Sequence, residues 1–395
     1  MKTNQLIIFL SIVLTIYSSA SWYIFKRGYQ AIGYNHKIQY IYTIIYCILF
    51  ASYIIFRIFD RFELHKISYI FTWIGSFWLA ALLYFFLIVL FIDILRLINH
   101  FIPFFPEFIT INIAKTKQIL FISSLLIVAL LLIYGRFNAI SPKVRTIDVS
   151  INKTANGLKN LKIAFVSDIH LGAIVDNGFV KKIVDLLNEQ NADIILLGGD
   201  TLDEDIGPVL ANKSGEPLKN LKARLGVWAI TGNHEYIGGI AQALPYLKSI
   251  GLNLLLDETR LIDNKFYLVG RLDRESFRFN GNKRAPLDSL ISSVENKSLP
   301  IILLDHQPFH LEEASNNGID FQLSGHTHNG QIYPFNLLAS KIFDIAWGYK
   351  QVGNTQYYVS CGVGTWGPPI RLGNTPEIVV INMKFESNDY IKSTK

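Results

Sequence analysis

The fold is decided by the stretch Leu161-Lys162-Ile163-Ala164-Phe165-Val166-Ser167-Asp168-Ile169-His170. Its first six residues, apolar except for Lys162, form a run that is typical of a strand buried on both faces. The run is followed by Asp168 and His170, whose i, i+2 spacing places a carboxylate and an imidazole on the same side of an extended chain. The sequence therefore predicts a buried strand that presents two metal-capable side chains at its carboxyl end.

Four later apolar runs end in the same way. Residues 194–197 precede Gly199-Asp200, residues 227–230 precede Gly232-Asn233-His234-Glu235, residues 301–304 precede Asp305-His306, and residues 319–323 precede Gly325-His326-Thr327-His328. Apolar residues recur at helical spacing between the first three runs, so strands alternate with helices and predict an α/β core with parallel strands. One such helix is expected around Leu218, Leu221 and Leu225. Turn signals at Asp263-Asn264 and Gly353-Asn354 predict hairpins, which make the sheet system mixed.

Each polar residue at these strand ends has an ordinary explanation when it is taken alone. Asp168 can cap a helix, and Asp200 or Asp203 can occupy a turn. Asn233 can adopt a left-handed turn, and His306 can be a satisfied core histidine.

Taken together, these residues favour a metal site. Five of the nine histidines lie at or just past the ends of apolar strands: His170, His234, His306, His326 and His328. In open α/β sheets, ligands collect at the carboxyl ends of the strands. A mixed set of oxygen and nitrogen donors suits a two-metal hydrolytic site, in which a carboxylate bridges the ions and a water is activated for attack.

Charge and hydropathy divide the chain at about residue 140. Residues 1–140 carry 11 Lys+Arg and 4 Asp+Glu, whereas residues 141–395 carry 26 and 27. The second part lacks the excess of cations that a nucleic-acid groove needs, so no nucleic-acid partner is expected. Cys47 and Cys361 fall in different parts, and no disulfide framework is implied.

The first part contains four apolar runs, at residues 6–24, 38–56, 70–92 and 119–134. We interpret them as four transmembrane helices; the alternative for the first run is a signal peptide cleaved near Ser18-Ser19-Ala20. Flanking cations number seven on one side and six on the other, which does not fix the orientation. Asp93 and Glu107 are expected at or beyond the end of the third span. No carboxylate is then clearly buried in lipid, so the sequence lacks the charged residues that usually mark an ion pathway.

The ordered motifs Asp168-x-His170, Gly199-Asp200, Gly232-Asn233-His234-Glu235, His306 and Gly325-His326-x-His328 resemble those of the calcineurin-like metallophosphoesterases. The resemblance covers roughly residues 160–385. Further matches at Ser167 to Gly172, Asp305 to Pro308 and Gly362 to Trp366 with Arg371 are similar to a membrane-associated bacterial branch. That branch is related to UDP-2,3-diacylglucosamine pyrophosphatases. Asn329 departs from the glycine of many members but tolerates the same backbone.

The resemblance implies a two-sheet sandwich flanked by helices and a role for each site residue. One metal would be held by Asp168, His170, Asp200 and His328, and the other by Asp200, Asn233, His306 and His326. His234 would be catalytic, protonating the leaving oxygen or stabilising charge on the phosphoryl group. The two divalent ions would be Mn, Fe or Zn. For Arg371 the sequence leaves two roles open, a phosphate contact or a structural ion pair.

The sequence thus predicts a transmembrane domain at residues 1–140 and a metallophosphoesterase domain at residues 141–395. The expected function is hydrolysis of a phosphodiester or pyrophosphate bond in a lipid-linked or nucleotide-linked substrate, with UDP-2,3-diacylglucosamine as one candidate. The expected location is a bacterial inner membrane, with the catalytic domain on the side of the N-terminus and the cytoplasm favoured. The alternative is a transporter or sensor with a regulatory phosphoesterase domain; a degenerate binding module is disfavoured because no ligand position is missing.

Overall fold

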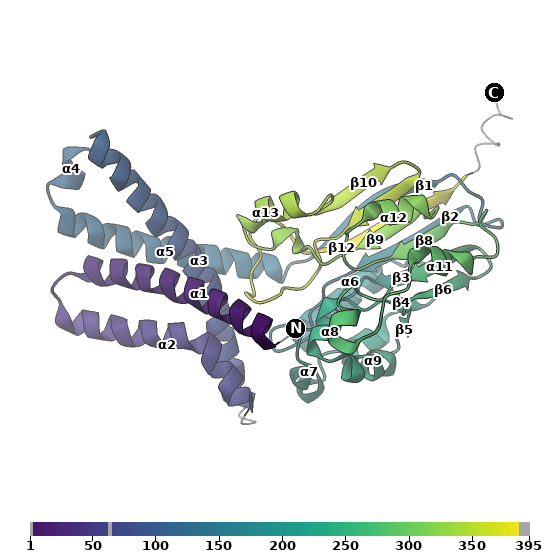
Figure 1. Cartoon of the computed structure of the whole chain (residues 1–395), viewed down its shortest axis with the longest axis horizontal. Coiled ribbons are helices and arrows are strands. Elements are labelled where there is room, and N and C mark those ends of the chain that lie inside the picture. The colour runs from purple at the N-terminus through teal and green to yellow at the C-terminus, as the bar shows by residue number, and fades with distance from the viewer. Residues whose placement is uncertain (1–2, 62–64, 387–395) are drawn as a thin grey trace. The chain divides into compact units, whose positions relative to one another are not determined.

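The structure is a computed structural model that describes residues 3–61 and 65–386 (Figure 1). Contacts along the chain divide it into two compact units. The helical unit comprises Met1–Phe137 with Gly367–Ile370, and the sheet unit comprises Asn138–Trp366 with Arg371–Lys395.

Each of the four apolar runs lies in a long helix of the helical unit. The helices are α1 (Thr3–Ile32), α2 (His36–Arg61), α3 (His65–Phe101), the short α4 (Glu107–Thr110) and α5 (Ile113–Ala139). Within the described residues, two helices are long and apolar enough to cross a membrane: Ile67–Phe101 and Ile113–Ala139. The expectation of four spans is thus met for two. Parts of the runs at 6–24 and 38–56 lie outside the described side chains, so spans there stay predictions.

The third apolar helix differs from its expected bounds. It was expected at residues 70–92, but α3 has 37 residues and continues past Asp93 to Phe101. Asp93 therefore lies inside the helix, while its position relative to the end of the membrane span stays a prediction. The carboxylate is tolerated inside the helix because Arg27 and Arg96 both form ion pairs with it, at 2.5 and 2.9 Å.

The sheet unit contains two six-stranded sheets. The first has the order β1-β12-β2-β3-β4-β5 and the second the order β10-β11-β9-β8-β7-β6. The strands of the first sheet are β1 (Lys143–Ile151), β2 (Asn160–Val166), β3 (Ile194–Leu197), β4 (Val227–Ala229), β5 (Asn253–Leu254) and β12 (Glu377–Phe385). The strands of the second are β6 (Glu258–Ile262), β7 (Phe266–Gly270), β8 (Ile301–Leu304), β9 (Phe321–Ser324), β10 (Gly348–Val352) and β11 (Thr355–Val359).

Both sheets are mixed, as the sequence predicts. Strands β2 to β5 are parallel, and so are β7, β8, β9 and β11. The antiparallel pairs β6–β7 and β10–β11 close around Asp263-Asn264 and Gly353-Asn354. Asp263, Asn264 and Gly353 have φ values of 49°, 54° and 61°, the left-handed conformation that a tight hairpin turn requires.

Helices and short helical turns connect the strands, and several of them pack against the sheets. They are α6 (Asn177–Glu189), α7 (Gly207–Asn212), η1 (Glu216–Asn220), α8 (Asn233–Gly238), α9 (Ile240–Ser249), α10 (Ser276–Asn280), α11 (Leu287–Ser292), α12 (Leu311–Asn316), η2 (His328–Gly330) and α13 (Phe335–Ile342). The helix expected around Leu218 is only a short 3-10 helix, because Pro217 starts it and Leu221 already has an extended backbone.

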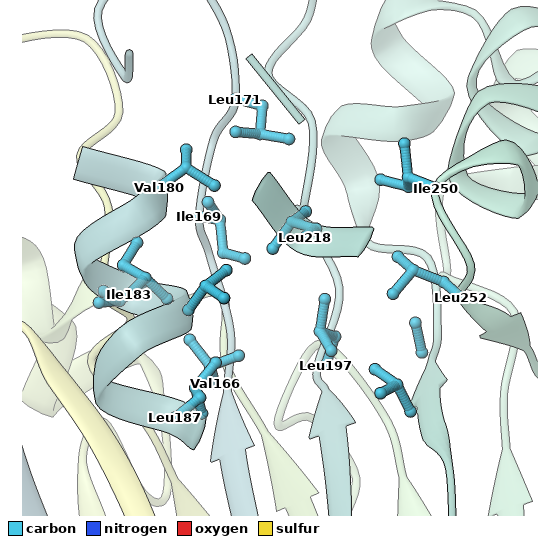
Figure 2. Close-up of a cluster of buried hydrophobic side chains, with 14 of the residues drawn as sticks. Val166, Ile169, Leu171, Val180, Ile183, Leu187, Leu197, Leu218, Ile250 and Leu252 are labelled. Carbon is cyan, nitrogen blue, oxygen red and sulfur yellow. The ribbon is translucent and has the colours of Figure 1, made fainter. Parts of the chain in front are cut away.

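Three apolar layers hold this unit together. Figure 2 shows the first, in which Val166 and Leu197 of the strands face Ile183 and Leu187 of α6. The second layer fills the space between the sheets, and the third packs α11 and α12 on the second sheet. The expected two-sheet sandwich flanked by helices is therefore present, and it fixes the carboxyl ends of β2, β3, β4, β8 and β9.

Candidate metal centre

The predicted site residues all follow the carboxyl ends of five strands. Three of these strands, β2, β3 and β4, are parallel neighbours in one sheet, and β8 and β9 are parallel neighbours in the other. The backbone turns sharply where the side chains emerge. Positive φ values occur at Asp168, His170, Asp200, His326 and His328. Such costly conformations persist at sites where the surrounding structure imposes them.

The first donor cluster consists of Asp168, His170 and His328, all buried. The Nε2 atoms of His170 and His328 lie 3.0 Å apart, and the Nε2 atom of His328 lies 3.6 Å from Oδ1 of Asp168. Two neighbouring imidazole ligands at ~2.1 Å from one octahedral ion are separated by ~3.0 Å. The spacing of the two rings therefore fits a shared ion.

The second donor cluster joins Asp200, His306 and His326, with Asn233 between the two rings. The Nε2 atom of His306 lies 3.0 Å from Oδ2 of Asp200. The Oδ1 atom of Asn233 lies 3.2 Å from this Nε2 and 2.8 Å from Nδ1 of His326. Two carboxamide or carboxylate oxygens and two imidazoles thus converge, a donor set that suits a borderline divalent ion.

Asp200 lies within reach of both clusters. Its Oδ2 atom is 3.0 Å from Nε2 of His306 and 4.0 Å from Nε2 of His170. Its Oδ1 atom accepts a 2.9 Å hydrogen bond from the backbone N–H of His234. This is the position that a bridging carboxylate needs.

A second layer of contacts orients the donors. The Nδ1 atom of His306 lies 2.8 Å from the carbonyl oxygen of Gly198, which places its proton there and leaves Nε2 to the site. Glu235 accepts hydrogen bonds from the backbone N–H groups of Asp200, Leu202 and Gly232. It therefore ties the loops after β3 and β4 together.

Burial and neighbouring charge set the protonation of the rings. Burial lowers the pKa of His326 to about 3, with help from His306. Burial also holds the pKa of His328 well below its usual value, with His170 and Arg371 adding to the effect. Both rings are therefore neutral, the form that binds a metal.

The comparisons with known proteins agree with this geometry. The family model of the calcineurin-like phosphoesterases matches residues 161–330. An uncharacterized metallophosphoesterase of Campylobacter jejuni is 31% identical over 382 residues, which is 96% of this chain and 98% of the relative. The chain belongs to the calcineurin-like metallophosphoesterases.

Two further metallophosphoesterases match over part of the chain. One from Helicobacter pylori is 36% identical over 244 residues, 61% of this chain and 64% of the relative. A zebrafish relative named transmembrane protein with metallophosphoesterase domain is 32% identical over 274 residues, 66% of this chain and 62% of the relative. The chain thus spans less than two thirds of the length of either relative.

Family membership confirms the predicted enzyme class, a metal-dependent phosphohydrolase of a family that uses two metal ions. The zebrafish name and the two apolar helices give weak support for membrane association. The link to UDP-2,3-diacylglucosamine and the choice among Mn, Fe and Zn stay predictions.

The metallophosphoesterase site also contains a residue that the sequence indicated only as a turn. Oδ1 of Asp203 lies 3.0 Å from Nδ1 of His234 and 3.8 Å from Nδ1 of His170. The signal was its position three residues after Asp200, but the direction of its side chain depends on the turn after β3. His170, Asp203 and His234 are also close enough to hold a metal, so a ligand role for His234 competes with a catalytic one.

His234 is placed to meet a substrate. Its side chain is 7% exposed, its ring contacts that of the exposed Trp366 at 5.9 Å, and its Nε2 atom bonds to none of the residues that the structure describes. Burial alone lowers the pKa of His234, but the carboxylates of Asp200 and Asp203 outweigh burial and raise the pKa to about 9. The ring can therefore carry a proton at neutral pH and offer it from Nε2.

Arg371 is engaged by other parts of the protein. The side chain is fully buried and donates from Nε and Nη2 to the carbonyl oxygen of Gly364 and from Nη1 to Oδ1 of Asn374. Its Nη2 atom lies 3.4 Å from Nδ1 of His328. Of the two roles left open by the sequence, Arg371 has the structural one, although its partners are uncharged.

Proposed function

We propose that the chain is a membrane-anchored, dinuclear phosphoesterase that hydrolyses a phosphodiester or pyrophosphate bond of a lipid-linked or nucleotide-linked substrate. The observation that carries the proposal is the pair of donor clusters that meet at Asp200. Two metal ions bound there would activate a water and neutralise charge on the phosphoryl oxygens. Asp168, His170, Asp200 and His328 would hold one ion, and Asp200, Asn233, His306 and His326 the other.

In this proposal His234 acts on the leaving oxygen. The carboxylate of Asp203 accepts a hydrogen bond from the N–H group at Nδ1 of His234 and so directs Nε2 towards the substrate. Its charge also stabilises the protonated ring. His234 then donates a proton to the leaving oxygen or stabilises charge on the phosphoryl group.

The proposal is tested by a screen of the purified full-length protein. Mn, Fe or Zn is supplied in turn, and phosphomonoesters, phosphodiesters and nucleotide-linked lipids such as UDP-2,3-diacylglucosamine are offered as substrates. We expect hydrolysis of a diester or pyrophosphate bond. Two bound ions without hydrolysis of any substrate would instead favour a binding or regulatory role.

We expect Asp203→Asn to keep both metal ions and to lower turnover about 10- to 100-fold, the usual loss for a contact that orients a site residue. An asparagine oxygen still accepts the hydrogen bond but removes the charge that raises the pKa of His234. Activity that needs the protonated ring should then fall off at a lower pH. Turnover is measured against pH, with metal content determined on the same samples.

The matched control for this variant is Asp205→Asn. Asp205 lies in the same loop, and its Oδ1 atom accepts a hydrogen bond from the backbone N–H of Gly207, which asparagine can replace. Turnover and metal content should be unchanged. A metal ion lost from Asp203→Asn alone would make Asp203 a ligand.

We further propose that residues 1–140 form four membrane spans that keep the enzyme in a bacterial inner membrane. The two apolar helices and the zebrafish relative's name support the anchor. Residues 141–395 would face the same side as the N-terminus, with the cytoplasm favoured. A lipid-linked substrate is then easy to reach.

A truncated protein that begins at Asn138 should be soluble and should hydrolyse bis(p-nitrophenyl) phosphate with metal. Asn138 is kept because its side chain donates hydrogen bonds to the carbonyl oxygens of Arg371 and Asn374. On a lipid phosphate embedded in vesicles, the truncated protein should be much slower than the full chain, since it lacks the anchor. Equal rates on the embedded lipid would contradict a lipid-linked substrate, and an insoluble fragment would show that the units do not fold separately.

A further inference from the structure

The helical unit contains a partly open cavity of about 690 Å³. This volume lies in the range of small-molecule sites. Residues from α1, α2, α3, α4 and α5 line it, and most of the wall is apolar. Ile24, Tyr46, Trp78, Phe85 and Leu120 are typical of this wall.

One end of the cavity is cationic. Arg27, Arg96 and Lys117 line it together with a single carboxylate, Asp93. Arg27 lies near the end of α1, Arg96 near the end of α3 and Lys117 near the start of α5. In Figure 1, α4 joins the ends of α3 and α5 on this side of the unit.

The charges at this end are not balanced. Asp93 accepts hydrogen bonds from Tyr23, Arg27 and Arg96 at 2.5, 2.5 and 2.9 Å, so both of its oxygens have partners. Lys117 forms no hydrogen bond or ion pair with any described residue. Three cations thus face one carboxylate, and the side chains of Arg27 and Arg96 are still 37% and 52% exposed.

With the apolar middle of α3 in the bilayer core, as the proposed membrane insertion requires, the cations at its end come to the depth of lipid head groups. With 37 residues, α3 is ~55 Å long, whereas the hydrocarbon core of a bilayer is ~30 Å thick. The last turns of α3 therefore reach the polar layer. Snorkelling alone would explain single cations there, but it does not explain three that converge on one cavity with an apolar wall. Basic pockets between membrane helices bind anionic lipid heads.

We propose that this cavity binds one anionic phospholipid, with its phosphate at Arg27, Arg96 and Lys117 and an acyl chain along the apolar wall. Asp93 holds the two guanidinium groups in place and leaves a net positive charge for the lipid. The inference rests on the membrane insertion proposed above, but it is independent of the phosphoesterase reaction.

The test uses the full-length protein in nanodiscs made from equimolar phosphatidylglycerol and phosphatidylcholine with identical acyl chains. The protein is released from the nanodiscs, and the lipids that stay bound to it are counted by native mass spectrometry. We expect one phosphatidylglycerol to be retained in preference to phosphatidylcholine. The double variant Arg96→Gln/Lys117→Gln should lower this preference about 25-fold, since each cation near an anionic lipid contributes roughly a factor of five.

The matched control is Lys26→Gln/Lys115→Gln. These lysines neighbour Arg27 and Lys117 in the sequence, but they do not line the cavity. The control should keep the preference. Equal retention of both lipids by the unmodified protein, or an equal loss in the control, would overturn the inference even if the double variant folds poorly.

Two further measurements distinguish a lipid site from a site for a free anion and from the phosphoesterase reaction. Inorganic phosphate is added to lipid-free protein; if phosphate binds and phosphatidylglycerol does not, the site takes a free anion and the inference fails. Hydrolysis of bis(p-nitrophenyl) phosphate is measured on the same preparations. Normal hydrolysis without lipid preference overturns only the lipid site, whereas lipid preference without hydrolysis overturns only the proposed reaction.

Discussion

Asp200→Asn should abolish hydrolysis and remove at least one metal ion per chain. Asp200 lies 3.0 and 4.0 Å from imidazoles of the two donor clusters, so its carboxylate is within reach of both. A neutral amide has nearly the same shape but cannot balance the charge of two divalent ions. The loss should exceed the ~10²–10³-fold effect of deleting one electrostatic contact to the transition state.

Metal content and turnover of bis(p-nitrophenyl) phosphate are measured on the same preparation. The control is Asp185→Asn, which removes one carboxylate from the exposed face of α6. It should keep both ions and full turnover. Two bound ions with near-normal turnover in Asp200→Asn would refute the assignment of the bridging ligand.

The strand ends were predictable from the sequence because each is a short apolar run that stops at a polar side chain. The run of apolar residues predicts a buried strand, and its last apolar residue predicts where that strand ends. The parallel order then brings Asp168, Asp200 and Asn233 to one edge. These steps need only local patterns and the geometry of parallel sheets.

The contacts of Asp203 and Arg371 were not predictable in this way. Asp203 meets His234 because the loop after β3 turns back, with a positive φ at Asp200 that no local pattern specifies. Arg371 is fully buried, and its Nη2 atom lies 3.4 Å from Nδ1 of His328, which is 43 residues away in the sequence. Both outcomes depend on tertiary packing.

In the helical unit, an ion pair between two helices was likewise not predictable from local sequence patterns. Asp93 ends an apolar window, and a single carboxylate is normally excluded from a membrane helix. Its partner Arg27 lies 66 residues earlier in the sequence, on another helix. The pairing of α1 with α3, which a local pattern does not show, thus adds to the local ion pair that Arg96 makes with Asp93.

His234→Asn should keep both metal ions and slow hydrolysis by ~10²–10⁴, the range for loss of a general acid. Asparagine keeps the backbone N–H that donates to Oδ1 of Asp200, so the bridging carboxylate stays oriented. It lacks a proton that can be transferred from the position of Nε2. The slowing should be largest for an alkyl phosphodiester, whose leaving oxygen needs the proton, and smaller for bis(p-nitrophenyl) phosphate, whose leaving group is stable as an anion.

The control is His310→Asn, since His310 is exposed and contacts only the nearby Glu312 among the described residues. It should not change turnover of either substrate. If His234→Asn loses a metal ion, His234 is a ligand, as its closeness to His170 and Asp203 allows. If both substrates slow equally while the metal stays bound, His234 stabilises charge on the phosphoryl group, because only proton donation depends on the basicity of the leaving oxygen.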